Sequence, residues 1–241
     1  MRELGKVVGH IPARAGSERV RSKNLRNIAG KPLLSYSIEA ALACPQLDEV
    51  VVNTDGDDLA ALADACGASV FRRDPQFASS KASGDSFTYD FISKYPVDTL
   101  VMVSPVCPMV TPADISEALT SFQNSDADTL ITSSDTQMQT FCGGNPVNID
   151  LNGPLEPTQN NTPVQTLNWA VTIWDCSAYK RHFEADGHAY IGRKRLLHPI
   201  DPLHGVKIST EGDFRTAERI LLSRTIKTNK EATYWKPKIS S

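Results

Sequence analysis

Four basic residues follow the first apolar segment of the chain, in a stretch rich in small residues. The segment VVGHI (residues 7–11) has the composition of a buried strand. Small side chains let backbone N–H groups approach an anion closely, and arginine and lysine side chains carry positive charge to phosphate oxygens. The stretch therefore predicts a binding loop for a nucleoside triphosphate, although a solvated basic surface loop would have a similar composition. The basic residues are Arg14, Arg19, Arg21 and Lys23, and the predicted cradle is Ala13, Arg14, Gly16, Ser17 and Lys23.

Apolar segments alternate with segments of helical periodicity over the first two-thirds of the chain. This alternation predicts an α/β fold: a Rossmann-like, three-layer arrangement with a mostly parallel sheet between helices. Ligands in such folds bind at the carboxyl ends of the strands, where the basic loop, the turn at 54–55 and residues 104–108 should converge. Strands are predicted at 7–11, 49–53, 69–71, 99–104 and 129–132, and helices at 32–43, 57–66, 85–93, 112–122 and 211–224.

Composition narrows the class of protein. The 241 residues carry a formal net charge of −3, which argues against a general nucleic-acid or membrane-surface binder. No apolar run is long enough to span a bilayer and no signal peptide is recognisable, so we expect a cytoplasmic protein. The five cysteines are widely spaced and indicate buried, reduced thiols rather than disulfides or a zinc site.

One segment breaks the strand–helix alternation. Residues 135–167 are rich in Asn, Gln, Gly, Pro and Thr and show little periodicity. They predict either a flexible loop or an arm that packs on another subunit, and we favour the arm. The remaining organisation is a single domain over residues 1–225, with the arm as part of it, followed by a polar tail at 226–241.

Several blocks of the sequence resemble one enzyme family. IPARAGSERVRSKNLRNIAGKPLLSYSIEAAL (11–42) and VVVNTDGDDLAALADACGASVFRRDPQFAS (50–79) are similar to the acylneuraminate cytidylyltransferases, the CMP-sugar-acid synthetases. Weaker similarity continues in SPVCPMVTPADISEAL, LNWAVTIW and VKISTEGDFRTAERIL. The resemblance implies transfer of CMP from CTP to a sugar acid with release of pyrophosphate. It also implies Mg²⁺ as cofactor, and a homodimer in which the arm borders the partner's active site.

The resemblance also assigns nucleotide-binding residues. Lys23 and Asn24 stand at the family's Lys-Asn pair, and catalytic roles are expected for Arg14 and Lys23. The base and ribose contacts fall on Arg73, Ala82 and Ser83. Three of these matches have structural alternatives: Asn24 could cap a helix or turn, Arg73 could be an ordinary surface arginine, and the family-matched Asp55 could cap the following helix.

Two departures from the family pattern concern the metal and the acceptor. The family's two magnesium-binding aspartates are replaced by Lys207 and Ser209, which leaves Asp201, Glu211 and Asp213 as nearby metal candidates. Of these, Asp213 matches a later acid of the family, but it could equally serve the first turn of a helix. The acceptor-binding positions are occupied by Ser104, Thr166 and Asn168; the first two stand where the family has Gln and Arg. These changes predict that N-acetylneuraminate is not the preferred acceptor.

The sequence therefore predicts a CTP-dependent cytidylyltransferase that takes a small anionic acceptor, by default a sialate-like 2-keto sugar acid. Two alternatives remain: a transferase of the same fold that uses a phosphorylated or phosphonate acceptor, and a catalytically silent nucleotide-binding paralogue. If the protein is active, we expect Mg²⁺ to be held mainly by triphosphate oxygens and water. His182, His188, His198, His204 and the basic run 193–195 could contact the acceptor, although solvated surface positions explain them as well.

Overall fold

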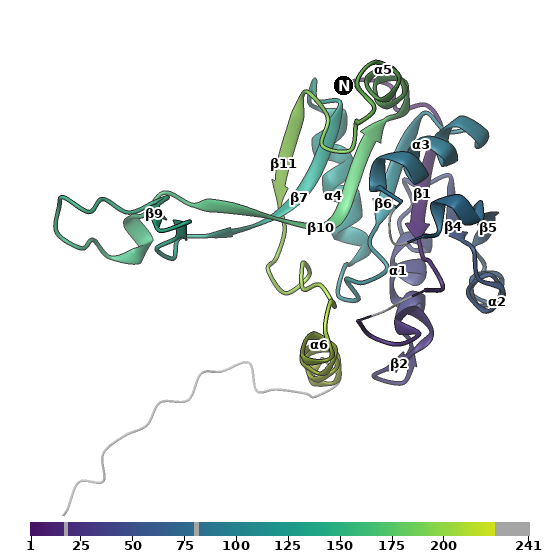
Figure 1. The fold of residues 1–241 in the computed structure, drawn as a ribbon, viewed down its shortest axis with the longest axis horizontal. Helices are drawn as coiled ribbons and strands as arrows, with labels where there is room; N and C mark the ends of the chain where they lie inside the picture. The colour runs from purple at the N-terminus through teal and green to yellow at the C-terminus, as the bar shows by residue number, and fades with distance from the viewer. Residues whose placement is uncertain (17–18, 80–81, 225–241) are drawn as a thin grey trace, which may run out of the picture.

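A seven-stranded sheet forms the centre of the computed structural model, which describes residues 1–16, 19–79 and 82–224 (Figure 1). The strand order is β11-β7-β10-β6-β1-β4-β5, and β10 runs antiparallel to both of its neighbours while the other paired strands are parallel. The sheet strands are β1 (Val7–Pro12), β4 (Glu49–Thr54), β5 (Ser69–Arg72), β6 (Thr99–Val103), β7 (Thr129–Thr136), β10 (Val164–Asp175) and β11 (Arg195–Pro199).

Helices cover both faces of this sheet. One face packs against α1 (Leu33–Leu42), α2 (Asp57–Ala65) and α4 (Pro112–Gln123), and the other against α3 (Gly84–Lys94) and α5 (Cys176–Asp186). The last helix, α6 (Glu211–Ser223), joins a smaller apolar cluster beside the carboxyl ends of the strands. The prediction of a Rossmann-like α/β fold with a mostly parallel sheet is confirmed.

The predicted elements agree closely with the structure where apolar periodicity was clear. All five predicted strands are present, and Pro112 is the first residue of α4, preceded by a complete capping box between Thr111 and Asp114. Pro32 instead occupies the N-cap position of α1, one residue before the helix begins. The sequence analysis missed β10 as a full strand, and also missed α5 and β11.

Residues 135–167 are more regular than predicted. The ends of β7 and β10 continue beyond the sheet as an antiparallel ribbon in which Thr136 pairs with Val164 and Ser134 with Thr166. Figure 1 shows this ribbon projecting away from the rest of the molecule. Short elements occupy its distal part: β8 (Phe141–Cys142), β9 (Asn145–Pro146) and the 3-10 turn η3 (Thr158–Asn160). The segment therefore has the shape of an arm.

Short elements near the carboxyl ends of the strands complete the fold. These are the 3-10 turns η1 (Lys23–Leu25) and η2 (Pro75–Phe77) and the small hairpin β2 (Asn27–Ile28) and β3 (Lys31–Pro32). Within the described residues, no helix is both long and apolar enough to cross a membrane. None of the five cysteines forms a disulfide, and Cys142 is exposed on the arm rather than buried as expected. The predicted tail at 226–241 lies outside the described residues.

Candidate active site

The loop after β1 is fixed to the neighbouring strand by backbone donors. The N–H of Ala13 donates to the carbonyl of Asn53 at 3.0 Å, and the N–H of Ala15 donates to Asp55 Oδ1 at 2.9 Å. Asp55 is therefore not the cap of α2, whose N-cap residue is Gly56. A side chain built at Gly16 would meet no atom within 4 Å, so the loop is open at that point. Ser17, a predicted cradle residue, lies outside the described residues.

Positive charge gathers around Lys23 at the end of this loop. Its ammonium donates to the carbonyl of Ile208 at 2.9 Å, which connects the loop to the segment before α6. Partial burial lowers the pKa of Lys23, and the nearby cations Arg19, Lys207 and Arg14 lower it further. The structure thus brings Lys207, a residue distant in sequence, into the predicted phosphate site.

Asn24 faces the same region with an unused acceptor. Its side chain is almost fully buried, and Oδ1 has no hydrogen-bond partner within the described part of the chain. The residue lies inside η1, whose N-cap is Ser22, so the capping alternative for Asn24 is wrong. A buried polar atom without a partner is costly in a folded protein, which fits a group that awaits a ligand.

Arg73 is a buried and rigidly held side chain, so its interpretation as a surface arginine is wrong. Its Nε donates to Asn53 Oδ1 and its Nη2 to the Asn53 carbonyl, both at 2.9 Å, and the guanidinium lies over the Phe87 ring. Burial lowers the pKa of Arg73 to about 10, which leaves it charged at neutral pH.

The amide of Asn53 also contacts a buried histidine. Asn53 Nδ2 lies 3.0 Å from His10 Nε2, and His10 is completely buried on β1 against Phe91. Burial, together with Arg73, lowers the pKa of His10 to about 3, so the ring is neutral and Nε2 accepts from the amide. Because the Arg73 guanidinium donates to the amide oxygen, the amide nitrogen faces His10. Sequence reasoning missed His10 and Asn53, because both lie within strand segments that otherwise indicate core.

The other predicted nucleotide contacts begin α3. Ser83 is the N-cap of this helix and its hydroxyl accepts from the N–H of Ser86. Ala82 directly precedes it, and its N–H donates to the carbonyl of Ser79. Gly84 lies against the Tyr190 ring so closely that a Cβ atom there would come within 2.9 Å of it.

The predicted acceptor residues meet where β10 enters the sheet. The N–H of Ser104 donates to the carbonyl of Ala170 at 2.9 Å, and Ser104 is buried. Asn168 is held on both ends of its amide: Oδ1 accepts from Thr132 Oγ1 at 2.6 Å and Nδ2 donates to Ser134 Oγ at 3.0 Å. Thr166, by contrast, is exposed at the base of the ribbon, and its hydroxyl donates to the carbonyl of Ser134.

A histidine–aspartate pair lies beside Asn168. The backbone of Gly205 packs directly on the Asn168 amide, and the preceding residue, His204, places Nδ1 3.0 Å from Asp114 Oδ1. The second oxygen of Asp114 is occupied by the capping box of α4, which fixes the carboxylate. A capping motif in the sequence could have identified Asp114, but nothing in the sequence could have paired it with His204.

Trp169, which sequence reasoning also missed, has an unusual backbone conformation. Its φ of 57° lies in the left-handed region, at the register shift of β10 between Leu167 and Thr172. A bulky side chain in that region costs on the order of 1–3 kcal/mol. Its ring packs on Tyr190, with the centroids 5.4 Å apart.

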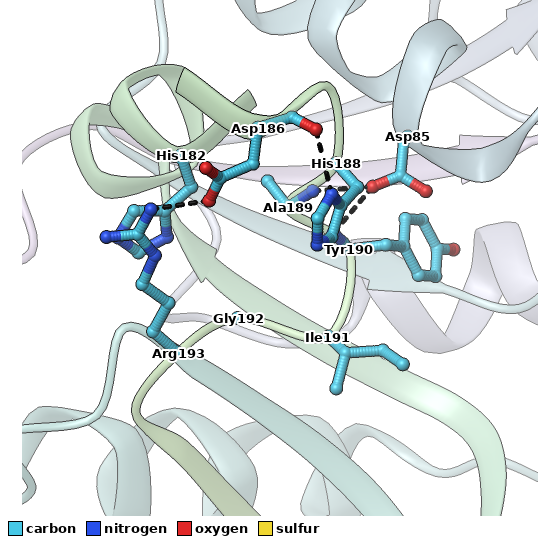
Figure 2. A pocket seen from close by; sticks show the side chains of 9 residues that line it. All are labelled: Asp85, His182, Asp186, His188, Ala189, Tyr190, Ile191, Gly192 and Arg193. Carbon is cyan, nitrogen blue, oxygen red and sulfur yellow. Dashed lines mark hydrogen bonds and ion pairs between the residues drawn. The ribbon is translucent and has the colours of Figure 1, made fainter. Parts of the chain in front are cut away.

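Three of the other predicted residues lie around a separate pocket, whereas His198 is half-buried on β11 and Lys194 pairs with Asp126. His182, His188 and Arg193 line a cavity of about 150 Å³ between α5 and the loop before β11, shown in Figure 2. Arg193 is paired with Asp186, and Asp85 accepts from the backbone N–H groups of this loop. These side chains are therefore occupied by contacts within the protein.

The carboxylates near Lys207 do not fit a protein-held magnesium ion. Asp213 accepts from the N–H groups of Ser209 and Thr210 in the capping box of α6, and these bonds lower its pKa. Glu211 is paired with Arg26, and Asp201 accepts a backbone N–H in its own turn. Within the described residues no group of three or more acidic, histidine or cysteine side chains could hold a metal. The structure thus gives Asp213 a capping role.

Cys107 is also part of this region but does not resemble a nucleophile. It is buried next to Ser104, and burial raises the pKa of its thiol to about 11. A thiol with so high a pKa is almost entirely protonated at neutral pH, so it is a weak nucleophile.

Comparison with known proteins identifies the family of the chain. A model of the family described as "Cytidylyltransferase" matches residues 8–220. The chain is 30% identical to CMP-N,N'-diacetyllegionaminic acid synthase of Legionella pneumophila, over 70% of this chain and 77% of that protein. It is 35% identical to N-acylneuraminate cytidylyltransferase of Escherichia coli over 49% of this chain, but that match spans only 28% of the longer relative.

Solved structures share the fold at low sequence identity. A CMP:2-keto-3-deoxy-manno-octonic acid synthetase complexed with CTP superposes with a TM-score of 0.69 and 15% identity, over 91% of this chain and all of that one. A cytidylyltransferase from Leptospira borgpetersenii gives a TM-score of 0.61 at 18% identity, over 92% of this chain and 88% of that one. The match of the family model to residues 8–220 shows that the chain belongs to the cytidylyltransferase family.

Proposed function

We propose that the protein transfers CMP from CTP to a small sugar acid of the 2-keto type and releases pyrophosphate. The observation that carries this proposal is the convergence of Arg14, Lys23 and Lys207 at the carboxyl ends of the strands, beside the fixed amide of Asn168. Such a cluster suits the triphosphate of CTP and the negative charge that develops on the leaving pyrophosphate. The curated relatives with 2-keto sugar acid names support the acceptor class.

The chemistry requires one bond to form and one to break. A hydroxyl oxygen of the acceptor attacks the α-phosphorus of CTP, and the bond from that phosphorus to the bridging oxygen of the β-phosphate breaks. The leaving pyrophosphate takes the electron pair and is stabilised by the guanidinium of Arg14 and the ammonium of Lys23. Arg73, held by Asn53, recognises the cytosine or ribose from the other side of the loop.

The hydroxyl proton needs an acceptor, and His204 supplies one in this proposal. Asp114 accepts a hydrogen bond from Nδ1, which leaves Nε2 as the ring nitrogen that can take the proton, in the manner of other carboxylate–histidine pairs. The His204 ring is partly exposed. The next residue, Gly205, packs against the Asn168 amide. The carboxylate would also stabilise the imidazolium formed after proton transfer.

Loss of the Arg14 guanidinium is expected to weaken nucleotide binding. The substitution Arg14→Ala should cost about 1.5–3 kcal/mol of CTP binding energy, roughly a 10- to 150-fold rise in Kd, because a charge-assisted contact to phosphate is lost. Titration calorimetry with CTP measures the change directly. Arg72→Ala is the matched control, since that arginine is exposed and paired with Asp57. An unchanged Kd for Arg14→Ala would sink the assignment of the loop.

A pyrophosphate-release assay tests the proposed function itself. The protein is incubated with CTP, Mg²⁺ and a panel of acids that includes eight- and nine-carbon 2-keto sugar acids, phosphorylated sugars and phosphonates. We expect release with a 2-keto sugar acid other than N-acetylneuraminate, because exposed Thr166 and buried Ser104 offer the acceptor no cation. Faster release with a phosphonate or phosphorylated acid would favour the alternative acceptor class. CTP binding without release from any acid would favour a silent paralogue.

Magnesium has no evident set of protein ligands here, so we propose that it arrives with the nucleotide. Triphosphate oxygens and water would be its ligands, and Lys207 would stand beside them as a fixed positive charge. Bound in this way, the ion neutralises part of the triphosphate charge.

The substitution Lys207→Asp separates the contribution of the Lys207 charge to CTP binding from that of Mg²⁺. It should weaken CTP binding in the absence of Mg²⁺ and make binding more dependent on added Mg²⁺, because a cation is replaced by a possible metal ligand. Calorimetric titration with CTP, with and without Mg²⁺, gives both values. Lys194→Asp is the control, because that lysine pairs with Asp126 and directly precedes β11, the strand at the edge of the sheet farthest from β4 and β5. Identical CTP affinities for Lys207→Asp and wild type under both conditions would place Lys207 away from the phosphates.

We also propose that the protein is a homodimer joined through the arm. Five large apolar side chains on the arm are more than half exposed: Met138, Phe141, Val147, Leu151 and Leu155. A projecting ribbon cannot bury these groups in its own fold, so a second copy of the chain is a suitable partner.

Light scattering of the purified protein should therefore report a dimer at micromolar concentration. The double substitution Phe141→Asp and Leu155→Asp is expected to produce a monomer, because charges would have to be desolvated in the interface. Leu42→Asp, which alters an exposed leucine of α1, should remain a dimer. A wild-type monomer, with or without CTP, would contradict the proposal.

A further inference from the structure

We propose that Trp169 forms a wall of the acceptor pocket, on which the C–H face of the sugar acid's pyranose ring stacks. The inference deepens the proposed function and rests on it for the class of acceptor. It starts from the backbone: the residue holds φ at 57°, a conformation that bulky side chains rarely adopt. Strained positions of this kind cluster at binding sites, where the surrounding structure maintains them.

The surroundings of Trp169 show what maintains the strained conformation. The preceding residue, Asn168, has its amide fixed by Thr132 and Ser134, and the N–H of the following residue, Ala170, donates to Asn168 Oδ1 at 3.1 Å. The chain is therefore held on both sides of the indole. Glycine would meet this backbone geometry without strain, so the presence of the largest side chain requires another reason.

Aromatic contacts place the indole between the two proposed subsites. Its ring packs on Tyr190, which in turn packs on the buried Trp174, with centroids 4.8 Å apart. The Tyr190 ring also lies against Gly84, the residue after Ser83 in the nucleotide subsite. In the other direction, Trp169 follows Asn168 in the acceptor subsite. The indole thus belongs to a continuous wall that runs from the nucleotide side to the acceptor side.

The chemistry of the ring matches a sugar. Trp169 is only partly buried, and within the described residues its indole N–H makes no hydrogen bond. An aromatic face is electron-rich and attracts the slightly positive C–H groups on one face of a pyranose. The indole N–H can donate to a hydroxyl or to the carboxylate of the same ligand. An aromatic platform of this kind would also favour acceptors of matching ring shape.

Three variants test this role in the full-length enzyme with the best acceptor from the panel. Trp169→Gly relieves the backbone strain and removes the ring, Trp169→Phe keeps an aromatic face, and Ala29→Gly relieves a positive φ of 47° in the β2–β3 turn, away from the acceptor residues. We expect Trp169→Gly to raise the acceptor KM at least about tenfold while the CTP KM stays within about twofold. Trp169→Phe should recover most of the loss, and Ala29→Gly should leave both constants unchanged.

Binding is measured separately from turnover, so that the two proposals can fail independently. In saturation-transfer NMR with CTP present, wild type should transfer magnetisation to the ring protons of the sugar acid, and Trp169→Gly should not. An acceptor KM and transfer signal unaffected by Trp169→Gly would overturn the role of Trp169 while the proposed function stands. So would an equal rise in the CTP KM, since the indole would then serve the nucleotide. A magnetisation-transfer signal that depends on Trp169, without any turnover, would contradict the proposed function but support the role of Trp169 in binding the sugar acid.

Discussion

The geometry of the nucleotide side depends on one asparagine at the carboxyl end of β4. The carbonyl of Asn53 accepts from Ala13 in the loop and from the Arg73 guanidinium, while its side-chain oxygen accepts from the same guanidinium. Its amide nitrogen donates to a neutral, buried His10. If the amide were reversed, two donors would face each other at Arg73, at the desolvation cost of unsatisfied buried groups. Arg73 therefore determines the orientation of the Asn53 amide, and the Asn53 carbonyl in turn holds both the loop and the guanidinium.

The same region concentrates charge of one sign. Lys23 has Arg19, Lys207 and Arg14 near it, and its pKa is lowered first by partial burial and then by these neighbouring cations. Three of the described carboxylates on this side are already engaged: Asp213 caps α6, Glu211 pairs with Arg26 and Asp55 accepts from Ala15. A polyanionic ligand would relieve the repulsion, so binding should stabilise the fold as well as satisfy the site.

The parallel strands and their helices could be predicted from the sequence because, in each strand–helix unit, a short run of β-branched residues is followed by a segment with clear helical periodicity. It did not reveal α5, whose buried residues are only Cys176, Ala178 and Tyr179 on an otherwise polar helix. The loop cations could be predicted from residue type and spacing. The contacts of His10 with Asn53, and of His204 with Asp114, depend on strand register and on how a loop returns to α4. Only the folded chain brings these distant segments together.

Strand β10 connects the acceptor side to the arm. Its first residues pair with β7 in the projecting ribbon, and its last residues lie antiparallel between β7 and β6 in the sheet. The register shift between these two parts contains Asn168 and Trp169, so the residues proposed to contact the acceptor lie at the point where the strand changes direction. Bulges of this kind redirect side chains at sheet edges and binding sites. Because one continuous strand carries both the proposed acceptor residues and the proposed dimer arm, a force that a second subunit exerted on the ribbon would act first on the backbone at Asn168 and Trp169.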